Sequence, residues 1–421
     1  MINFASGISF DPHKNKDMPH IYTMIRIAFF TIMLTACGSD AAKQEDKKAV
    51  VEEVADSQIK VGAAQMEEYL PLLQNKNVGM VVNHTTMLGE THLVDSLLSR
   101  GIAIKKIFAP EHGFRGDTPA GDKVGNEVDS KTGIPILSLY GSHNKPTKED
   151  LSGLDVVIFD IQDVGARFYT YTSTMSYAME ACAENGLPFI VLDRPNPLGN
   201  VIDGPVLEEA QKSFVGLHPI PIAYGLTMGE LATMINNEGW LENSVKADLQ
   251  VIRLANWTHS SSYNLPVSPS PNLPTDHSIA WYPSICLFEG TMMSLGRGTH
   301  FPFEVLGYPS PEFGDFQFTP VPIPGMSMDP KHQDKLCYGI DMRQAPVPNA
   351  VDLSYLISFY KKTPADSSFF NNYFALLAGT PDLRKQIEQG MSEAEIKATW
   401  QEKLNAYKQI RKKHLLYDDL E

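Results

Sequence analysis

The chain has 421 residues, of which 43% are hydrophobic and 20% are charged, a composition typical of a folded protein with a sizeable core. The formal net charge of −15 at pH 7 and a pI near 5.3 argue against a nucleic-acid partner, because such a partner requires a basic surface. At roughly 150 residues per domain, this length predicts two or three domains.

The first recognisable segment is a short apolar run after Arg26 that ends in Leu34-Thr35-Ala36-Cys37. It is too short to span a bilayer and is typical of a signal-peptide hydrophobic region. Its last four residues resemble a bacterial lipobox, which implies a lipid anchor at Cys37, although a short core helix with an incidental cysteine is the alternative. We therefore expect a lipoprotein signal region over residues 1–37, a flexible tether over 38–60, and an envelope protein that is periplasmic or surface-facing.

From Lys76 onward, short apolar runs alternate with segments of helical spacing. Examples are the run Ile102 to Phe108, which predicts a strand, and residues 170–186, which predict a helix ending at Asn185-Gly186. This alternation predicts a doubly wound, mostly parallel α/β sheet over residues 61–275. After the Pro/Ser-rich stretch 267–275 the periodicity weakens, and a helical tail covers 392–416, so we expect a smaller α+β domain over 276–421 that completes a cleft.

Polar residues follow four of the predicted strands. Because parallel sheets place their ligands beyond the carboxyl ends of the strands, one pocket could collect these side chains. They are Asn83-His84, Glu111-His112, Asp160 to Asp163 and Asp193-Arg194.

Glu111 stands out because it comes directly after Pro110 at the end of a buried strand, beside His112 and near Arg115. A glycosidase needs a carboxylic acid to protonate the leaving oxygen, and a second carboxylate or a neighbouring group at the other face of the sugar. Asp160 and Asp163 are candidates for the second group. Strand-end acids can equally cap helices or accept backbone N–H bonds, so this assignment stays open.

Two further segments suit a sugar that bears a carboxylate. Arg167 and Tyr169 follow the Asp160 to Asp163 segment, and a glycine-rich loop carries Glu289 and Arg297. Core tyrosines or a structural salt bridge would explain the same residues. His84, His112 and His300 lack the spacing of metal ligands, and Cys182, Cys286 and Cys337 fit neither a zinc motif nor a disulfide framework. The sequence therefore supports no metal site, and we expect no cofactor.

Five segments together resemble the NamZ family of exo-β-N-acetylmuramidases, formerly a domain family of unknown function. They are "APEHGFRGD", "DIQDVGARFYTY", "DRPNPLGN", "SPNLPT" and "EGTMMSLGRGTHFPFE". The resemblance extends from about Lys76 to the C-terminus. It implies a Rossmann-like domain followed by a smaller C-terminal domain, and release of β-1,4-linked N-acetylmuramic acid from the non-reducing end of peptidoglycan fragments.

The resemblance also implies that Glu111 is the catalytic carboxylate. His112 and Arg115 would position it, and Arg115, Arg167 or Arg297 would pair with the lactyl carboxylate of muramic acid. The complete set of candidate residues comprises the catalytic Glu111, Asp160 and Asp163, and the substrate-binding Asn83, His84, His112, Arg115, Gln162, Arg167, Tyr169, Asp193, Arg194, Asn196, Glu289 and Arg297.

Two other functions fit the same residues. A non-catalytic lipoprotein could bind muropeptides in this pocket and deliver them to a transporter. A metal-dependent amidase could instead act on muropeptides through the histidines, Asp160 and Asp163, and it would lose activity to a chelator. In each case the expected partners are peptidoglycan-derived saccharides or muropeptides, and the membrane through Cys37.

Overall fold

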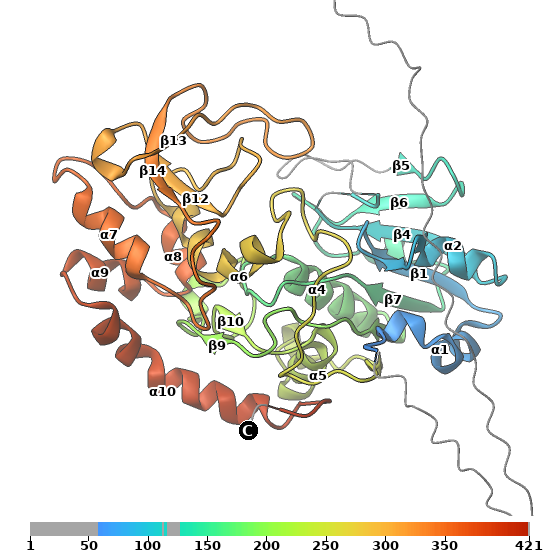
Figure 1. Cartoon of the computed structure of the whole chain (residues 1–421). Helices are drawn as coiled ribbons and strands as arrows, with labels where there is room; N and C mark the ends of the chain where they lie inside the picture. The colour runs from blue at the N-terminus through green and yellow to red at the C-terminus, as the bar shows by residue number, and fades with distance from the viewer. Residues whose placement is uncertain (1–57, 112, 116–126, 420–421) are drawn as a thin grey trace, which may run out of the picture. The chain divides into compact units, whose positions relative to one another are not determined.

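The structure is a computed structural model that describes residues 58–111, 113–115 and 127–419. Its main feature is a seven-stranded sheet in the order β11-β8-β7-β1-β4-β6-β5, in which every pair is parallel except β5 with β6 (Figure 1). The strands are β1 (Asn77–Val82), β4 (Ala103–Ala109), β5 (Glu127–Val128), β6 (Pro135–Ser138), β7 (Val156–Asp160), β8 (Phe189–Leu192) and β11 (Leu249–Ile252).

The sheet is doubly wound. The chain starts in the middle of the sheet at β1, moves outward through β4 and β6, and then returns to the other side of β1 with β7 before moving outward through β8 and β11. The strand order therefore reverses between β1 and β7, and an open sheet of this kind has a crevice at the carboxyl ends of those two strands. This arrangement confirms the predicted Rossmann-like, mostly parallel α/β fold.

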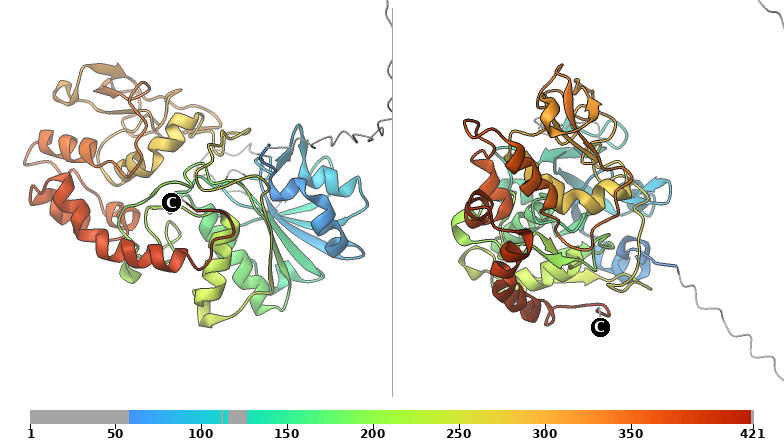
Figure 2. Two further views of the ribbon diagram at one scale, coloured as in Figure 1. Left: turned by 60° about the horizontal axis from the view of Figure 1, so that its bottom comes forward. Right: turned by 60° about the vertical axis from the view of Figure 1, so that its left-hand side comes forward.

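Helices cover both faces of the sheet (Figure 2). Met80 and Val82 of β1 pack with α1 and α2 on one face, whereas Val81 of β1 and Phe159 of β7 pack with α4 and α5 on the other. Alternate strand residues thus enter two different cores, which explains the nearly continuous apolar runs in the sequence. The helices are α1 (Met66–Leu73), α2 (Leu93–Leu98), α3 (Lys148–Leu151), α4 (Tyr171–Glu184) and α5 (Met228–Glu238).

From Asp276 onward the chain forms a smaller α+β unit, the shorter of the two parts called halves below. Its sheet has three antiparallel strands in the order β12-β14-β13, and helices precede and follow it. The elements are α6 (Asp276–Ile285), β12 (Val305–Tyr308), β13 (Phe316–Phe318), β14 (Cys337–Asp341), α7 (Ser354–Lys362), α8 (Tyr373–Ala378), α9 (Asp382–Glu388) and α10 (Glu393–Arg411).

The two halves share one hydrophobic core. Met175 of α4 and Leu231 of α5 belong to the same buried cluster as Trp281 of α6, Phe374 of α8 and Tyr407 of α10. A continuous core of this kind holds the residues between the halves in a fixed geometry, and the cleft described below lies among them.

The long C-terminal helix α10 returns to the first half of the chain through buried hydrogen bonds. The indole Nε1 of Trp400 donates to Asp203 at 3.1 Å, and the Tyr407 hydroxyl donates to the carbonyl of Tyr224 at 2.6 Å. Arg411 donates from Nε to the carbonyl of Gly225 at 2.8 Å. Two of these bonds supply donors to buried backbone carbonyls, and the bond of Trp400 supplies one to a buried carboxylate.

Several elements agree with the sequence analysis. The predicted strand at 102–108 is β4, the helix at 170–186 is α4, and the helical tail at 392–416 contains α10. The short strand β6 was not anticipated. Within the described ranges, no helix has both the length and the apolar character needed to cross a membrane.

We expect Tyr407→Phe to lower the free energy of unfolding by about 1–2 kcal/mol, because it leaves the buried Tyr224 carbonyl without its donor. Chemical denaturation measures this loss. Tyr360→Phe is the matched control, since no hydrogen bond of its hydroxyl with another described residue is found, and it should change stability by less than about 0.5 kcal/mol. Equal stabilities of the two variants would contradict the role assigned to this bond.

Candidate active site

The carboxyl ends of the parallel strands bring the polar segments found in the sequence to one edge of the sheet. Asn83 follows β1, Glu111 follows β4 after Pro110, Gln162 follows β7, and Asp193 follows β8. Only part of this set reaches an open cavity, because the other side chains are buried beneath it. The side chains that line the cavity therefore decide what the site can do.

The cavity, here called the Glu111 cleft, consists of two adjoining chambers. The larger encloses about 1020 Å³ of empty space, part of it open to solvent, and the smaller about 430 Å³. The walls of both chambers include Glu111, Phe168, Thr170, Tyr282 and Arg297. Since α6 supplies Tyr282 and the loop after it supplies Arg297, both halves of the chain build the cleft.

Glu111 is the carboxylate common to both chambers. The hydroxyl of Tyr140, two residues beyond β6, donates to Glu111 Oε1 at 3.0 Å, and the Tyr171 hydroxyl lies 3.5 Å from the Glu111 carbonyl oxygen. Burial, together with the charge of Glu111, raises the pKa of Tyr140 above its ordinary value, so this phenol remains protonated and keeps its donor role. Glu111 is thus oriented by a neutral donor and faces the cleft.

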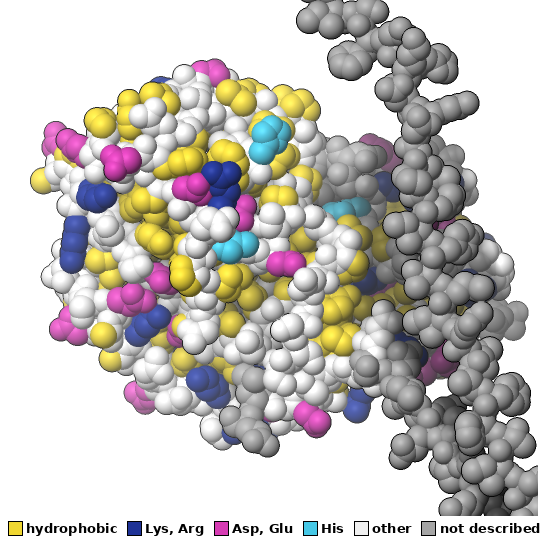
Figure 3. Space-filling model, in the orientation of Figure 1, with side chains coloured by type: hydrophobic (Ala, Val, Ile, Leu, Met, Phe, Trp, Pro, Cys, Tyr) yellow, Lys and Arg dark blue, Asp and Glu magenta, His cyan; other side chains and the backbone are white. Residues whose placement is uncertain are grey.

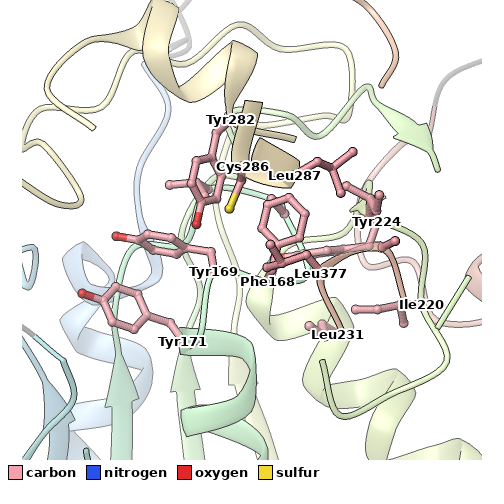
Figure 4. Close-up of a cluster of buried hydrophobic side chains, with 14 of the residues drawn as sticks. Phe168, Tyr169, Tyr171, Ile220, Tyr224, Leu231, Tyr282, Cys286, Leu287 and Leu377 are labelled. Carbon is pink, nitrogen blue, oxygen red and sulfur yellow. The ribbon is translucent and has the colours of Figure 1, made fainter. Parts of the chain in front are cut away.

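Aromatic side chains form much of the wall of the smaller chamber. Tyr169 makes edge-to-face contacts with Tyr171 and Tyr282, with ring centroids 4.8 and 5.8 Å apart (Figure 4). The Tyr169 hydroxyl is fixed by donation to the Pro269 carbonyl at 2.7 Å, and Phe303 completes this wall. Flat apolar surfaces with hydroxyls at their edges suit the faces and rim of a sugar ring.

The wall of the larger chamber also carries an ion-pair cluster. Arg297 Nε lies 2.5 Å from Glu289 Oε1, and Lys331 Nζ lies 3.7 Å from Glu289 Oε2. Burial disfavours ionised Glu289, but the charges of Arg297 and Lys331 outweigh it and lower the pKa of Glu289. Glu289 is therefore held as a carboxylate by its two basic neighbours.

Over the face shown in Figure 3, acidic and basic side chains of the described residues are interspersed rather than gathered by sign.

Asp160 and Arg194 form a buried ion pair instead of facing the cleft. Arg194 donates from Nε and Nη2 to the two carboxylate oxygens of Asp160, at 2.5 and 2.9 Å. Both side chains are nearly inaccessible to solvent, since Arg194 is 3% exposed and Asp160 is 0% exposed. The pair connects the carboxyl ends of β7 and β8.

Asp163 and Gln162 are also buried beneath the cleft. Asp163 Oδ2 accepts hydrogen bonds from the Tyr224 hydroxyl and from the Gly165 amide, the latter at 2.7 Å. Gln162 donates to the carbonyls of Asp163 and Pro195. Burial raises the pKa of Asp163 to about 7. Asp163 thus stabilises the loop that follows β7, and it lines neither chamber.

Three more predicted residues have structural partners at the strand ends. Asp193 accepts from Thr227 at 2.7 Å and from Tyr417 at 2.5 Å, and burial raises its pKa to about 7. Asn196 donates to the Leu226 carbonyl and accepts from the Leu198 amide. Asn83 accepts from the amide and hydroxyl of Thr85.

The other basic candidates lie outside the cleft wall. Arg167 is 1% exposed and donates to the carbonyls of Pro205, Ile220 and Leu377. Arg115 forms two hydrogen bonds with Asp129, at 3.0 and 2.9 Å. His84 Nε2 lies 3.0 Å from the Ser268 carbonyl oxygen. Of the arginines proposed for a substrate carboxylate, Arg297 is the one that the structure places in the cleft.

Tyr140, Tyr282 and Lys331 are site residues that the sequence analysis did not identify. Tyr140 follows a strand of only four residues, and the apolar alternation around "IPILSLY" is the signal that could have revealed it. His112 and Cys37 lie outside the described residues. Among the residues that the structure does describe, no group of three or more His, Cys, Asp or Glu could hold a metal ion.

Fold and cleft together define a class of protein, a doubly wound α/β enzyme whose cleft, at the carboxyl ends of the parallel strands, presents carboxyl groups beside aromatic walls. Family models identify it further. The N-terminal model of "Exo-beta-N-acetylmuramidase NamZ" matches residues 78–277, and the C-terminal model matches residues 280–417. The chain belongs to the NamZ family, and it is a glycoside hydrolase.

Individual relatives agree with this assignment. The chain is 40% identical over 413 residues to the peptidoglycan β-N-acetylmuramidase NamZ of Bacillus subtilis, with 92% of this chain and 97% of the relative covered. Two crystal structures of DUF1343 family proteins from Bacteroides fragilis are also similar. The first has a TM-score of 0.80 and 46% sequence identity, and the match covers 86% of this chain and 100% of that chain. The second has a TM-score of 0.74 and 30% identity, and the match covers 86% of this chain and 99% of that chain.

The raised pKa of Asp163 predicts that the free energy of unfolding depends on pH. Because its folded-state pKa of about 7 lies above the ordinary value of 3.8, the folded protein holds a proton that the unfolded chain releases between these values. The contribution of Asp163 to stability is therefore greatest below pH 4 and is lost as the pH rises through about 7.

Asp163→Asn removes this titration, so the variant lacks the loss of stability that the wild type shows as the pH rises. The free energy of unfolding of the variant, relative to the wild type, should therefore increase between pH 4.5 and pH 7.5. Urea denaturation at both pH values measures the difference. The exposed Asp315→Asn serves as control and should show no such relative gain. An unchanged difference between Asp163→Asn and wild type across this range would disprove the assignment.

Proposed function

We propose that this enzyme is an exo-acting β-N-acetylmuramidase, which removes β-1,4-linked N-acetylmuramic acid from the non-reducing end of peptidoglycan fragments. The main support is Glu111, a carboxyl group shared by two adjoining chambers and oriented by Tyr140. The name of the Bacillus subtilis relative gives the substrate class, peptidoglycan, and the family description gives the exo mode.

In this proposal Glu111 is the general acid. It donates its proton to the glycosidic oxygen as the bond from that oxygen to the anomeric carbon breaks, so that the departing sugar leaves as a neutral alcohol. Water then supplies a hydroxyl to the anomeric carbon, and its remaining proton restores the acid. The Tyr140 hydroxyl keeps the Glu111 carboxyl directed into the cleft while the proton is transferred.

The two unequal chambers support the exo mode. A terminal sugar fits a small chamber with aromatic walls, while the rest of the fragment needs a larger one that opens to solvent. Glu111 borders both chambers. If the substrate spans them, the glycosidic oxygen between its first two sugars would lie beside Glu111. Asp160 and Asp163 act on this site indirectly, through the strand ends and loop that they hold.

Glu111→Gln should lower kcat on a muramic acid–glucosamine disaccharide by about a hundredfold or more, because the amide cannot donate the proton. With a 2,4-dinitrophenyl muramoside, whose leaving group needs no proton, the same variant should lose much less. Steady-state kinetics on the two substrates measures both losses.

The exposed Glu312→Gln is the matched control and should keep wild-type kinetics on both substrates. Equal losses of Glu111→Gln on the activated and the natural leaving group would exclude an acid role for Glu111. Circular dichroism of each variant would confirm that the fold is retained.

We also propose that Cys37 carries a lipid anchor that holds the enzyme beside the cell wall. The lipobox-like run Leu34 to Cys37 and the charged segment after it are the supporting observations. Cys37→Ser should move the protein from the membrane fraction to the soluble fraction after cell disruption, as read by immunoblot. Retention of this variant in the membrane fraction would refute lipid attachment at this residue.

A further inference from the structure

Arg297 is the basic side chain that lines the Glu111 cleft among the described residues. It borders both chambers, and its side chain remains 30% exposed. Its position raises the question of which ligand group it meets, because a guanidinium forms its most specific hydrogen bonds with a carboxylate or another planar anion.

The backbone around Arg297 is tightly fixed. Gly296 and Gly298 both have positive φ angles, of 87° and 78°, which glycine adopts without strain. A Cβ atom at Gly298 would lie 2.7 Å from the Val321 carbonyl oxygen, and one at Gly296 would lie 2.9 Å from the Phe301 carbonyl oxygen. Close packing on both sides of Arg297 therefore determines where its side chain enters the cleft.

Two contacts orient the guanidinium group itself, and Lys331 supports one of them. Its Nε donates to Glu289, and its central carbon lies 5.1 Å from the ring centroid of Phe303. Lys331 lies on the other side of Glu289 and donates to the carbonyls of Phe288, Glu289 and Thr291 at 2.9 to 3.2 Å. Two cations share one carboxylate here, so the cluster retains a positive charge toward the cleft.

The terminal groups Nη1 and Nη2 of Arg297 form no hydrogen bond with any other residue in the described part of the chain. The Nε–Glu289 bond and the Phe303 ring fix the plane of the guanidinium, while this terminal pair stays available on the side that lines the chambers. Two parallel N–H groups of this kind match the two oxygens of a carboxylate.

We infer that Arg297 binds the lactyl carboxylate of muramic acid and thereby distinguishes a terminal muramoside from a glucosaminide, which lacks this group. The inference rests on the proposed muramidase function and adds the residue that sets its specificity. Glu289 is then a positioning residue, which holds the guanidinium in the required plane.

Two substrates that differ only in this carboxylate test the inference. They are the 4-nitrophenyl β-glycoside of N-acetylmuramic acid and the same compound with its lactyl group as the neutral methyl ester. The wild type should prefer the free acid in kcat/KM by roughly 10- to 100-fold, the range expected for hydrogen bonds to a charged group. Arg297→Gln should lose this preference, because its loss in kcat/KM should fall mainly on the free acid.

Arg297→Lys keeps the charge but lacks the planar pair of N–H groups, so it should show an intermediate preference. Arg384→Gln is the control, because Arg384 pairs with Glu388 on α9 and lines neither chamber. It should retain the full preference. If wild type prefers the acid but Arg297→Gln keeps that preference, or loses activity equally on both substrates, the inference is wrong.

A binding measurement separates this inference from the catalytic proposal. Calorimetry with the Glu111→Gln variant should show tighter binding of free N-acetylmuramic acid than of its methyl ester, and Arg297→Gln in the same background should abolish the difference. Equal binding of the two sugars to Glu111→Gln would overturn the role of Arg297. Selective binding by an enzyme that cleaves no muramoside would instead overturn the muramidase function and leave the carboxylate site in place.

Discussion

The buried ion pair between Asp160 and Arg194 is the interaction on which the geometry of the site depends. It joins the end of β7 to the end of β8, and the Thr86 hydroxyl, just beyond β1, donates to the Asp160 carbonyl at 2.5 Å. Removal of one partner from such a pair costs about 3–5 kcal/mol, because the other charge stays buried without compensation. The switch point of the sheet, where the strand order reverses, is thereby held rigid beneath the cleft.

On this base the cleft holds two carboxyl groups with different neighbours. Glu289 lies between Arg297 and Lys331, whose charges stabilise its ionised form. Glu111 accepts a hydrogen bond from the Tyr140 phenol, and in the proposed mechanism it is the carboxyl group that releases a proton. In the proposed function, Arg297 and Glu289 serve recognition, and Glu111 serves the chemistry.

The sequence predicted the architecture well because buried parallel strands and their helices leave long periodic signals, as in β4, α4 and α10. It also indicated that polar residues gather at the strand ends, and Glu111 was identified from its place after Pro110. Which of these residues face the cleft could not be predicted. Arg167 beside aromatic residues has the same local pattern whether it meets a ligand or, as here, three buried carbonyls.

Contacts between site residues from distant segments of the chain could not be predicted from the sequence either. Tyr140 and Glu111 are 29 residues apart, and their contact requires that β6 lie next to β4, although β6 itself is only four residues long. Lys331 reaches Glu289 from a loop between β13 and β14, which no periodic pattern connects to the cleft. Such contacts depend on the packing of the two halves around their shared core.

The most direct test of the account is to incubate the domain that follows Cys37 with two disaccharides and to analyse the products by mass spectrometry. One is N-acetylmuramic acid linked to N-acetylglucosamine, and the other has the two sugars in the reverse order. The account predicts free N-acetylmuramic acid from the first disaccharide and no cleavage of the second. Cleavage of the second, or binding of the first without cleavage, would contradict an exo-acting muramidase that uses Glu111 as its acid.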